Sequence, residues 1–299
     1  MSVLGALRAT ARRMATARRV GVGVAAVGGF AASSCETISF ARCDEESAVA
    51  AAAAFGGLAA GAAVGYMAAA PASASPIKAY YTMTGAPNPQ IVDLAAAELG
   101  VDLKEVTVEV DLVGLKNRTD PEQVKLNPTG GLPFVELWSG LVVSETMAIC
   151  ELMDDGTLMG RTPEEQATTR MWHRRVEQQI CLPIMNSFRW GAAKDFFKAR
   201  GPHGMLGNDD AAKQQLAVAQ NQLKWLDEQM STTDNTWICG DRYSMADVTL
   251  FAMLWFFCVT PGFGPPYPEL LEATDIPWIK AWYARVAARP ASKACEPGA

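Results

Sequence analysis

Histidine and paired cysteines are what this 299-residue sequence has least of. It contains two histidines, His173 and His203, which argues against a histidine-based metal site. Its seven cysteines include no CxxC pair and follow no regular spacing, so a zinc ribbon and a disulfide framework are both excluded. We therefore expect a protein without a structural or catalytic metal.

Acidic residues are absent from the beginning of the chain. Between Met1 and Cys35 there are five arginines and no Asp or Glu, a composition typical of an organellar presequence. The pair Arg18-Arg19 is only a weak match to a twin-arginine signal. We predict that residues 1–46 are a targeting presequence and that the protein is organellar, in a mitochondrion or a plastid.

The next segment, residues 47–76, contains no charged residue. Its centre, Ala48–Ala70, holds 13 Ala and 4 Gly among 23 residues. This length permits a membrane span, and the glycine spacing suits close helix packing. Ala and Gly drive insertion weakly, however, so a cleavable spacer is an equal alternative. Residues 48–70 are predicted to be a membrane anchor, or else to belong to a spacer that is removed.

The remainder of the chain is acidic. The whole sequence has 26 Lys and Arg against 32 Asp and Glu, and residues 1–76 hold six of the arginines and four of the acids. This leaves 20 basic and 28 acidic residues, a net charge of −8. Such a surface binds nucleic acid poorly, so no nucleic-acid partner is expected.

Residues 77–155 alternate between strand and helix patterns. The order is a strand, a helix, a strand, a short helix, a hairpin and a helix, which is typical of a thioredoxin-like α/β domain. The strands are expected at Ile77–Thr82, Val106–Leu112, Leu132–Trp138 and Leu141–Ser144, and the helices at Gln90–Leu99, Thr119–Leu126 and Glu145–Met153, the last with Ala148, Ile149 and Leu152 facing inward.

Residues 163–299 are predicted to form an all-α domain, after a linker at Gly156–Thr162. Ser244 and Asp247 have the spacing of a capping box, which marks a helix start. The helices are expected at Pro163–Asn186, Asp209–Met230, Ser244–Phe257 and Ile276–Ala288.

Three motifs carry a resemblance to a known family. They are N-P-T-G-G-L-P at 127–133, S-E-T-M-A-I at 144–149 and G-D-R-Y-S-M-A-D at 240–247. In this order and at these separations they resemble the cytosolic-type glutathione S-transferases, over roughly residues 77–290. The resemblance implies the glutathione transferase fold, with a thioredoxin-like N-terminal domain and an all-helical C-terminal domain.

The resemblance also implies how glutathione would bind. The main chain of Leu132, before a cis Pro133, would pair with the cysteinyl part. Glu145 would lie near the γ-glutamyl ammonium, and Thr146 would bind the γ-glutamyl carboxylate at a helix N-terminus. The alternatives are an ordinary strand proline at Pro133 and a merely structural helix start at Glu145. Gly131 stands where many family members carry a basic or polar side chain.

The residue that stabilises the thiolate lies outside the three motifs. A free thiol has a pKa of roughly 8.5, so the protein must favour the anion. Ala86 stands where a Ser or Cys is usual, and no Cys lies between residues 43 and 150. The resemblance to the Thr-Pro-Asn of the nu class, which tends toward disulfide reduction, makes Asn88 the first candidate.

Three other side chains near the end of the first strand remain alternatives for this role. Thr84 and Thr82 offer hydroxyl groups, and Tyr81 offers a phenol. Asn88 itself has a structural alternative, because Asn88 followed by Pro89 is a favourable N-cap and N1 pair.

The second substrate is expected against the first helix of the all-α domain. Met171, Arg174, Arg175 and Trp190 combine apolar surface with positive charge there. Either arginine could instead be a solvated residue or a dimer contact, and His173 is expected at the surface or in an interface. Four cysteines have apolar neighbours that are typical of inert core thiols, namely Cys150, Cys181, Cys239 and Cys258.

The resemblance implies thiolate attack on a hydrophobic or anionic electrophile, or glutathione-dependent reduction of a disulfide or peroxide. No bound cofactor is implied, because glutathione is a cosubstrate, and a homodimer is expected. The alternative from another class is a non-catalytic scaffold or ligand-binding subunit of an organellar membrane complex. Ala86 and Gly131 favour that alternative.

Overall fold

The computed structural model describes residues 75–111, 114–198, 206–259 and 266–295. The chain divides into two units, residues 1–69 and 70–299, and all described residues belong to the second unit. The predicted presequence at 1–46, and the predicted anchor or spacer at 48–70, lie outside the described residues. None of the described helices is both long and apolar enough to cross a membrane.

Four strands form one mixed sheet in the order β2–β1–β3–β4. β1 is parallel to β2 and antiparallel to β3, and β3 is antiparallel to β4. A hairpin joins β3 to β4, whereas β1 pairs with strands that follow it in the chain after intervening helices. Segments distant in sequence therefore lie side by side in this sheet. The strands are β1 (Ile77–Thr82), β2 (Thr107–Glu109), β3 (Phe134–Leu137) and β4 (Val142–Ser144).

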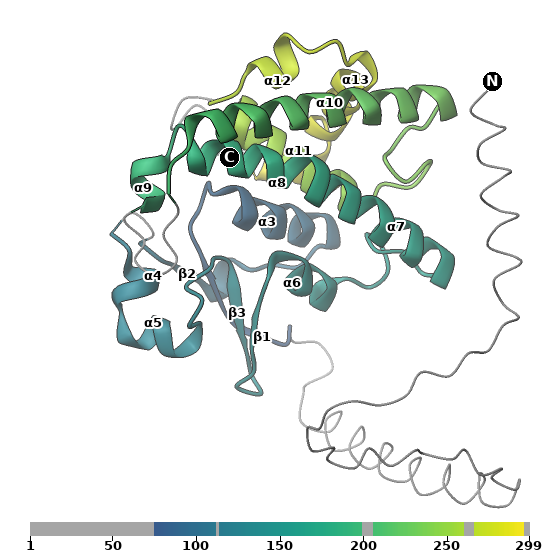
Figure 1. Ribbon diagram of the computed structural model, residues 1–299. Coiled ribbons are helices and arrows are strands. Elements are labelled where there is room, and N and C mark those ends of the chain that lie inside the picture. The colour runs from purple at the N-terminus through teal and green to yellow at the C-terminus, as the bar shows by residue number, and fades with distance from the viewer. Residues whose placement is uncertain (1–74, 112–113, 199–205, 260–265, 296–299) are drawn as a thin grey trace, which may run out of the picture. The chain divides into compact units, whose positions relative to one another are not determined.

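Helices α3 (Pro87–Leu99) and α6 (Thr146–Met153) lie on the same face of this sheet (Figure 1). Tyr80 of β1 points toward α3, where its hydroxyl donates to Asp93 Oδ1 at 3.0 Å. The connection from β2 to β3 contains two short helices. The short helical elements of this domain are η1 (Lys104–Val106), α4 (Lys116–Thr119) and α5 (Pro121–Leu126). The predicted element order is confirmed.

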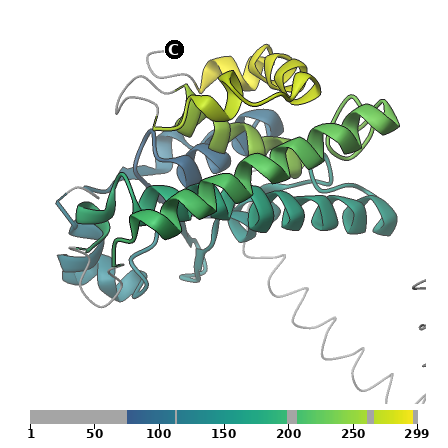
Figure 2. The ribbon, with the colours of Figure 1, turned by 45° about the horizontal axis from the view of Figure 1, so that its top comes forward.

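The C-terminal part is helical throughout its described residues, as predicted. α7 (Pro163–Val176), η2 (Glu177–Cys181) and α8 (Leu182–Trp190) form one continuous helical segment, and α10 packs along it (Figures 1 and 2). The other helices are α9 (Lys194–Lys198), α10 (Asp209–Thr233), α11 (Met245–Cys258), α12 (Glu269–Glu272), α13 (Pro277–Ala287) and α14 (Pro290–Ala294).

Helix α11 is the centre of this helical domain. Thirteen of its residues are buried, so it is apolar on every side rather than along one stripe. Its N-terminus carries the predicted capping box, which is confirmed: Asp247 Oδ2 accepts from the main chain and hydroxyl of Ser244, at 2.9 Å each. Asp247 Oδ1 accepts from Trp282 Nε1 at 2.8 Å and from the Ile238 main chain at 3.0 Å.

The two domains share one packed core. α11 packs against α3, and α14 returns to α3 from the end of the described chain. Arg289 makes two hydrogen bonds to the Glu98 carboxylate, at 2.6 and 2.7 Å, and its guanidinium lies 3.8 Å from the Tyr243 ring centre. The position of the thioredoxin-like domain relative to the helices is therefore fixed by apolar packing and by this ion pair.

Several local predictions were wrong. The second strand, predicted at Val106–Leu112, is limited to the three residues of β2. All three are exposed, because β2 is an edge strand and no core packs on either of its faces. Ala148 was predicted to face inward but is exposed. The short helices α9, α12 and α14 were not predicted, since four or five residues carry no periodic signal.

Candidate functional site

Three segments that are distant in sequence meet at one edge of the sheet. Tyr81 pairs with Phe134, and Phe134 pairs with Ser144, so these three residues form one row across β1, β3 and β4. Just beyond this row lie the end of β1 with the loop to α3, the segment before β3, and the start of α6. The register therefore brings together the regions that contain Asn88, Leu132 and Glu145.

The segment before β3 is held in place by side-chain hydrogen bonds. Asn127 Nδ2 donates to the Gly131 carbonyl at 2.8 Å, and the Thr129 hydroxyl donates to Asn127 Oδ1 at 2.7 Å. The buried Asn117 donates to the Gly130 carbonyl. Gly130 has φ of 59°, and a Cβ there would lie 2.9 Å from the Asn117 carbonyl oxygen, so only glycine fits.

The peptide bond between Leu132 and Pro133 is cis, as predicted. The main-chain N–H and carbonyl of Leu132 make no hydrogen bond within the part of the chain that the structure describes. A half-buried residue beside a sheet edge thus keeps both polar main-chain groups available for a ligand.

The N-terminus of α6 is open. Glu145 occupies the N-cap position without a side-chain hydrogen bond, and the first turn contains no acidic residue. The N–H groups of residues 146–148 precede the first intrahelical bond, which Ile149 donates to the Glu145 carbonyl at 3.2 Å. Glu145 is exposed and has φ of 74°, a left-handed value that a non-glycine residue adopts only under strain. These free N–H groups favour an anion.

The N-terminus of α3 also lacks a side-chain cap, because Ala86 is its N-cap residue. Asn88 lies inside the first turn, so the structural alternative that made it an N-cap is not what the structure shows. Pro87 and Pro89 have no N–H. Asn88 therefore supplies the only main-chain N–H in the residues 87–89, and neither that group nor its side chain bonds to another described residue.

The hydroxyl groups of Thr84 and Thr82, the two alternative donors, already donate to other side chains. Thr84 donates its hydroxyl to Glu109, whose other oxygen accepts from the Thr84 main chain at 3.2 Å. A carboxylate beside Thr84 would repel a thiolate. Thr82 is buried and donates to Tyr80 at 3.3 Å. The structure therefore disfavours both threonines as donors to sulfur.

Tyr81 lies on the other face of the sheet from α3. Its ring stacks on Phe134 with 4.4 Å between centres, and its neighbour Tyr80 points to the α3 side. Burial raises the pKa of the Tyr81 phenol. A tyrosine that activates a thiol needs the opposite shift, so this alternative is also disfavoured.

An arginine that the sequence analysis did not select lies beside the loop before β3. A Cβ at Gly130 would lie 3.3 Å from Arg118 Nη1, so the Arg118 side chain packs against this loop. Arg118 Nε is buried and has no hydrogen-bond partner among the described residues, and burial lowers the pKa of the guanidinium. The signal was its position on α4, which only the folded structure reveals. Gly131, in contrast, leaves space: a Cβ there would meet only Thr129 Oγ1, at 3.5 Å.

The four residues predicted for the second substrate do not lie together. Met171 and Trp190 are 19 residues apart on one helical segment, which separates them by about 28 Å along its axis. Arg174 is paired with Glu177 at 2.8 Å, and Arg175 lies 4.8 Å from the Trp172 ring centre. A single small-molecule site cannot include all four residues, because helical periodicity ignores distance along the axis.

His173 was predicted at the surface or in an interface, and this prediction was wrong. It is buried between α7 and α11, where its Nε2 lies 3.1 Å from the Thr249 hydroxyl oxygen. The cysteine prediction is supported by burial, which raises the pKa of the thiols of Cys150, Cys181, Cys239 and Cys258 and so disfavours the reactive thiolate.

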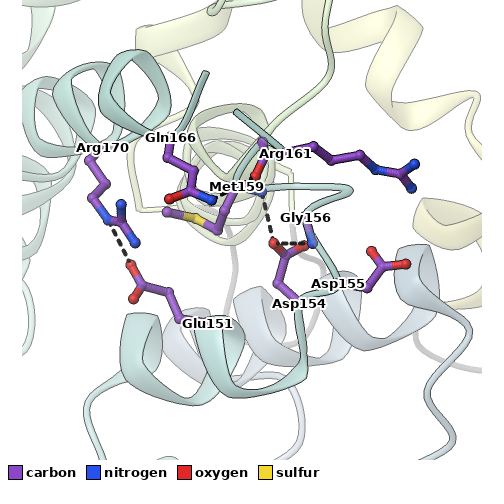
Figure 3. Close-up of a pocket in the computed structure, with 9 residues that line it drawn as sticks. Glu151, Asp154, Asp155, Gly156, Met159, Arg161, Gln166 and Arg170 are labelled. Atoms are coloured by element: carbon purple, nitrogen blue, oxygen red, sulfur yellow. Dashed lines mark hydrogen bonds and ion pairs between the residues drawn. The ribbon is translucent and has the colours of Figure 1, made fainter. Parts of the chain in front are cut away.

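A polar pocket of about 450 Å³ opens at the opposite end of α6 (Figure 3). Asp154 accepts from the main chain of Gly156 and Leu158, at 2.9 and 2.8 Å, and Glu151 pairs with Arg170 at 3.4 Å. Three acidic residues line this pocket against two arginines, one of which is paired with Glu151, so the pocket suits the carboxylates of glutathione poorly. It is therefore distinct from the sheet-edge site, and its polar groups mainly order the linker between the domains.

The fold and this sheet edge define a thioredoxin-like domain with an attached helical domain, and the comparisons place the chain within a family. Residues 86–155 match the family model for the glutathione S-transferase N-terminal domain, and residues 209–285 match the model for the C-terminal domain. The chain belongs to the glutathione S-transferase family.

Similar proteins include both transferases and a translation factor. The chain is 29% identical to glutathione S-transferase 2 of Saccharomyces cerevisiae over 218 residues, which cover 71% of this chain and 87% of that protein. The crystal structure of Gtt2 from Saccharomyces cerevisiae matches with a TM-score of 0.61 at 27% identity, over 72% of this chain and 99% of that chain. Elongation factor 1-gamma of Carassius auratus is 25% identical over 195 residues, which cover 63% of this chain and 41% of the factor.

Proposed function

We propose that this protein binds glutathione at the sheet edge and uses its thiolate as a nucleophile. One observation carries the proposal: α3 and α6 both begin without a side-chain cap, at the same edge of the sheet. Exposed N–H groups and helix dipoles at this edge suit an anionic ligand. Membership of the glutathione S-transferase family supports glutathione as that ligand.

The roles proposed for the binding residues rest on the family resemblance and are compatible with their positions at the sheet edge. The Leu132 main chain would pair with the cysteinyl part, and Glu145 would bind the γ-glutamyl ammonium. Thr146 and the open turn of α6 would bind the γ-glutamyl carboxylate. Arg118, a cation without an acidic partner among the described residues, would attract the glycyl carboxylate.

Asn88 is the best-supported donor to the sulfur, through its main-chain N–H and its carboxamide. The thiolate then attacks an electrophilic carbon and displaces a leaving group, or attacks a disulfide and displaces one of its thiolates. In the second case a mixed disulfide forms, and another glutathione thiolate resolves it to oxidised glutathione. Glutathione is the cosubstrate, and no bound cofactor takes part in this proposal.

The test is retention on immobilised glutathione. Glu145→Ala should abolish retention, because it removes the partner of the ammonium, while the melting temperature stays nearly unchanged. Glu122→Ala is the matched control, since Glu122 is an exposed acid in the first turn of α5. Retention that survives Glu145→Ala, or a loss that is accompanied by unfolding, would contradict the assignment.

A non-catalytic role is the second candidate, and two observations favour it. Ala86 at the start of α3 has no hydroxyl or thiol, and Thr84 is occupied by Glu109. The similarity to elongation factor 1-gamma shows that the family match alone does not establish turnover. A protein that binds glutathione without lowering the pKa of its thiol would fit this second candidate.

We also propose an organellar protein that acts as a homodimer, in which residues 48–70 are either a membrane anchor or part of a spacer that is removed. The composition of residues 1–76 supports the location and both forms of this segment, and the family supports the dimer. Alkaline extraction of isolated organelle membranes distinguishes a retained anchor from a removed spacer. Sedimentation equilibrium of the purified protein tests the dimer.

A further inference from the structure

Arg189, in the last turn of α8, is a charged residue to which the proposed glutathione site assigns no role. Among the described residues its buried Nε has no hydrogen-bond partner, and none of their ion pairs includes Arg189. Burial lowers the pKa of its guanidinium, and no charged neighbour in the described part of the chain offsets this shift. A largely buried cation without a counter-ion is unfavourable unless a ligand supplies the charge.

The surroundings of Arg189 are aromatic. Its guanidinium lies 5.6 Å from the ring centre of Phe197. Phe188, its neighbour in sequence, makes edge-to-face contacts with Phe197, Phe256 and Phe257. The segments 199–205 and 260–265 contain no Asp or Glu, so neither can supply a carboxylate to Arg189.

This end of α8 lies on the same side of the molecule as the loop 127–133, which precedes β3. In both ribbon views α9, which follows α8, lies on the side of α4 and α5, and the loop 127–133 follows α5 (Figures 1 and 2). Trp190, the predicted second-substrate residue at this end, is adjacent to Arg189. The predicted arginines Arg174 and Arg175 are a further 14 or 15 residues along the segment.

We propose that Arg189 binds a carboxylate of the second substrate, an electrophile whose charged group is carried on a flat aromatic or conjugated body. The inference rests on the proposed transferase function and names its substrate class. A guanidinium pairs with a carboxylate through two parallel hydrogen bonds, and the aromatic rings beside it provide a flat apolar surface. Arg189 is thus a specificity-determining residue, distinct from the groups that hold glutathione.

The test compares two electrophiles that differ only in charge, 4-chloro-3-nitrobenzoate and its methyl ester. With either one, the glutathione sulfur bonds to the ring carbon and chloride leaves. Each kcat/KM is divided by the uncatalysed rate constant, which removes the intrinsic difference in reactivity. Arg189→Met should lower the ratio of carboxylate to ester by roughly tenfold to 100-fold. Arg189→Lys should lower it less, since the charge remains.

Arg161→Met is the matched control, because Arg161 is exposed in the interdomain linker and its loss changes the net charge equally. This variant should leave the ratio unchanged. An unchanged ratio in Arg189→Met, or an equal loss toward both electrophiles with a raised pKa of the bound thiol, would overturn the proposal. The second outcome would instead assign Arg189 to the thiolate.

Binding without turnover separates this inference from the transferase proposal. The unreactive 3-nitrobenzoate should raise the melting temperature of the wild-type protein, and its methyl ester should raise it less. Arg189→Met should abolish this difference without lowering the melting temperature of the free protein. A lower melting temperature together with an unaltered difference would show that Arg189 only stabilises the end of α8. These results are obtained even if neither electrophile is turned over.

Discussion

Helices α6 and α11 both start beside a serine, but side chains cap the N-terminus of α11 and leave that of α6 uncapped. At α11, Ser244 and Asp247 form a capping box, and Asp247 is fully buried with four donors around its carboxylate. At α6, Glu145 is exposed at the N-cap and caps nothing. Both starts belong to the motifs that carry the family resemblance, yet only one of them is closed by the protein itself.

The difference separates a structural motif from a binding motif. A helix that only has to be stable satisfies its first N–H groups with its own side chains, as α11 does. An uncapped start beside a non-glycine residue at φ of 74° is less stable, so something else must favour it. We infer that α6 is open because a ligand completes it, and the same reasoning applies to α3.

The largest expected effect is on stability, at the capped N-terminus of α11. Asp247→Ala removes the acceptor for two main-chain N–H groups, a hydroxyl and the Trp282 indole, and should lower the free energy of unfolding by about 3–5 kcal/mol. Guanidinium unfolding measures this change, with the exposed Asp210→Ala as the control. A loss below about 1 kcal/mol would remove the distinction between the two helix starts.

The open start of α3 is tested by kinetics. Asn88→Ala should lower kcat by about 10- to 100-fold, with the KM for glutathione nearly unchanged, because the amide acts on the developing thiolate. The exposed Asn221→Ala on α10 is the control. If kinetics are unchanged, the Asn88 side chain does not act on the sulfur, and the main-chain N–H groups at this edge become the remaining donors.

The comparison also shows what the sequence could predict. The capping box, the hairpin and the start of α6 are local patterns, and the structure has all three. The row of Tyr81, Phe134 and Ser144 also depends on the pairing of Tyr81 with Phe134, which are more than 50 residues apart in sequence, and periodicity cannot reveal that pairing. The family resemblance supplied the expectation that these segments meet.

The partners of individual side chains could not be predicted from the sequence for the same reason. Thr84 was a reasonable hydroxyl donor until Glu109 was placed beside it by the pairing of β1 with β2. Arg118 and Arg189 were not singled out, because a missing counter-ion is a property of the folded chain. Met171, Arg174 and Arg175 were grouped with Trp190 because of their side-chain types, although they lie far from it along the helical segment.

Asp93 gives a pH-dependent test of how α3 is held. Burial raises the pKa of this carboxyl to about 6, and Tyr80 partly opposes the shift by donating to it. The pKa in the unfolded chain is about 3.9, so between pH 4 and 6 the folded protein binds more protons, and its stability falls as the pH rises through this range.

The variant Asp93→Asn keeps an acceptor for Tyr80 and removes this penalty. It should raise the free energy of unfolding by about 1–2 kcal/mol at pH 7 and by little at pH 4. Denaturant unfolding at both pH values, with the exposed Asp102→Asn as the control, measures the change. The same gain at both pH values would show that titration of Asp93 is not its cause.

The smallest expected effect is at the open start of α6. Glu145→Gly should relieve the strain at φ of 74° but increase the freedom of the unfolded chain, so it should stabilise the free protein by at most about 1 kcal/mol. Glutathione retention should be lost at the same time. A clear loss of stability, measured by thermal unfolding, would mean that Glu145 holds the helix start.

The central claim is that the open sheet edge activates a thiol, and the bound thiol itself tests it most directly. Ultraviolet difference absorbance of the protein with glutathione follows the thiolate as the pH is varied. The account predicts a bound thiol pKa well below the free value of roughly 8.5. A bound thiol that titrates like the free one, or no binding at all, would contradict the account and favour the non-catalytic role.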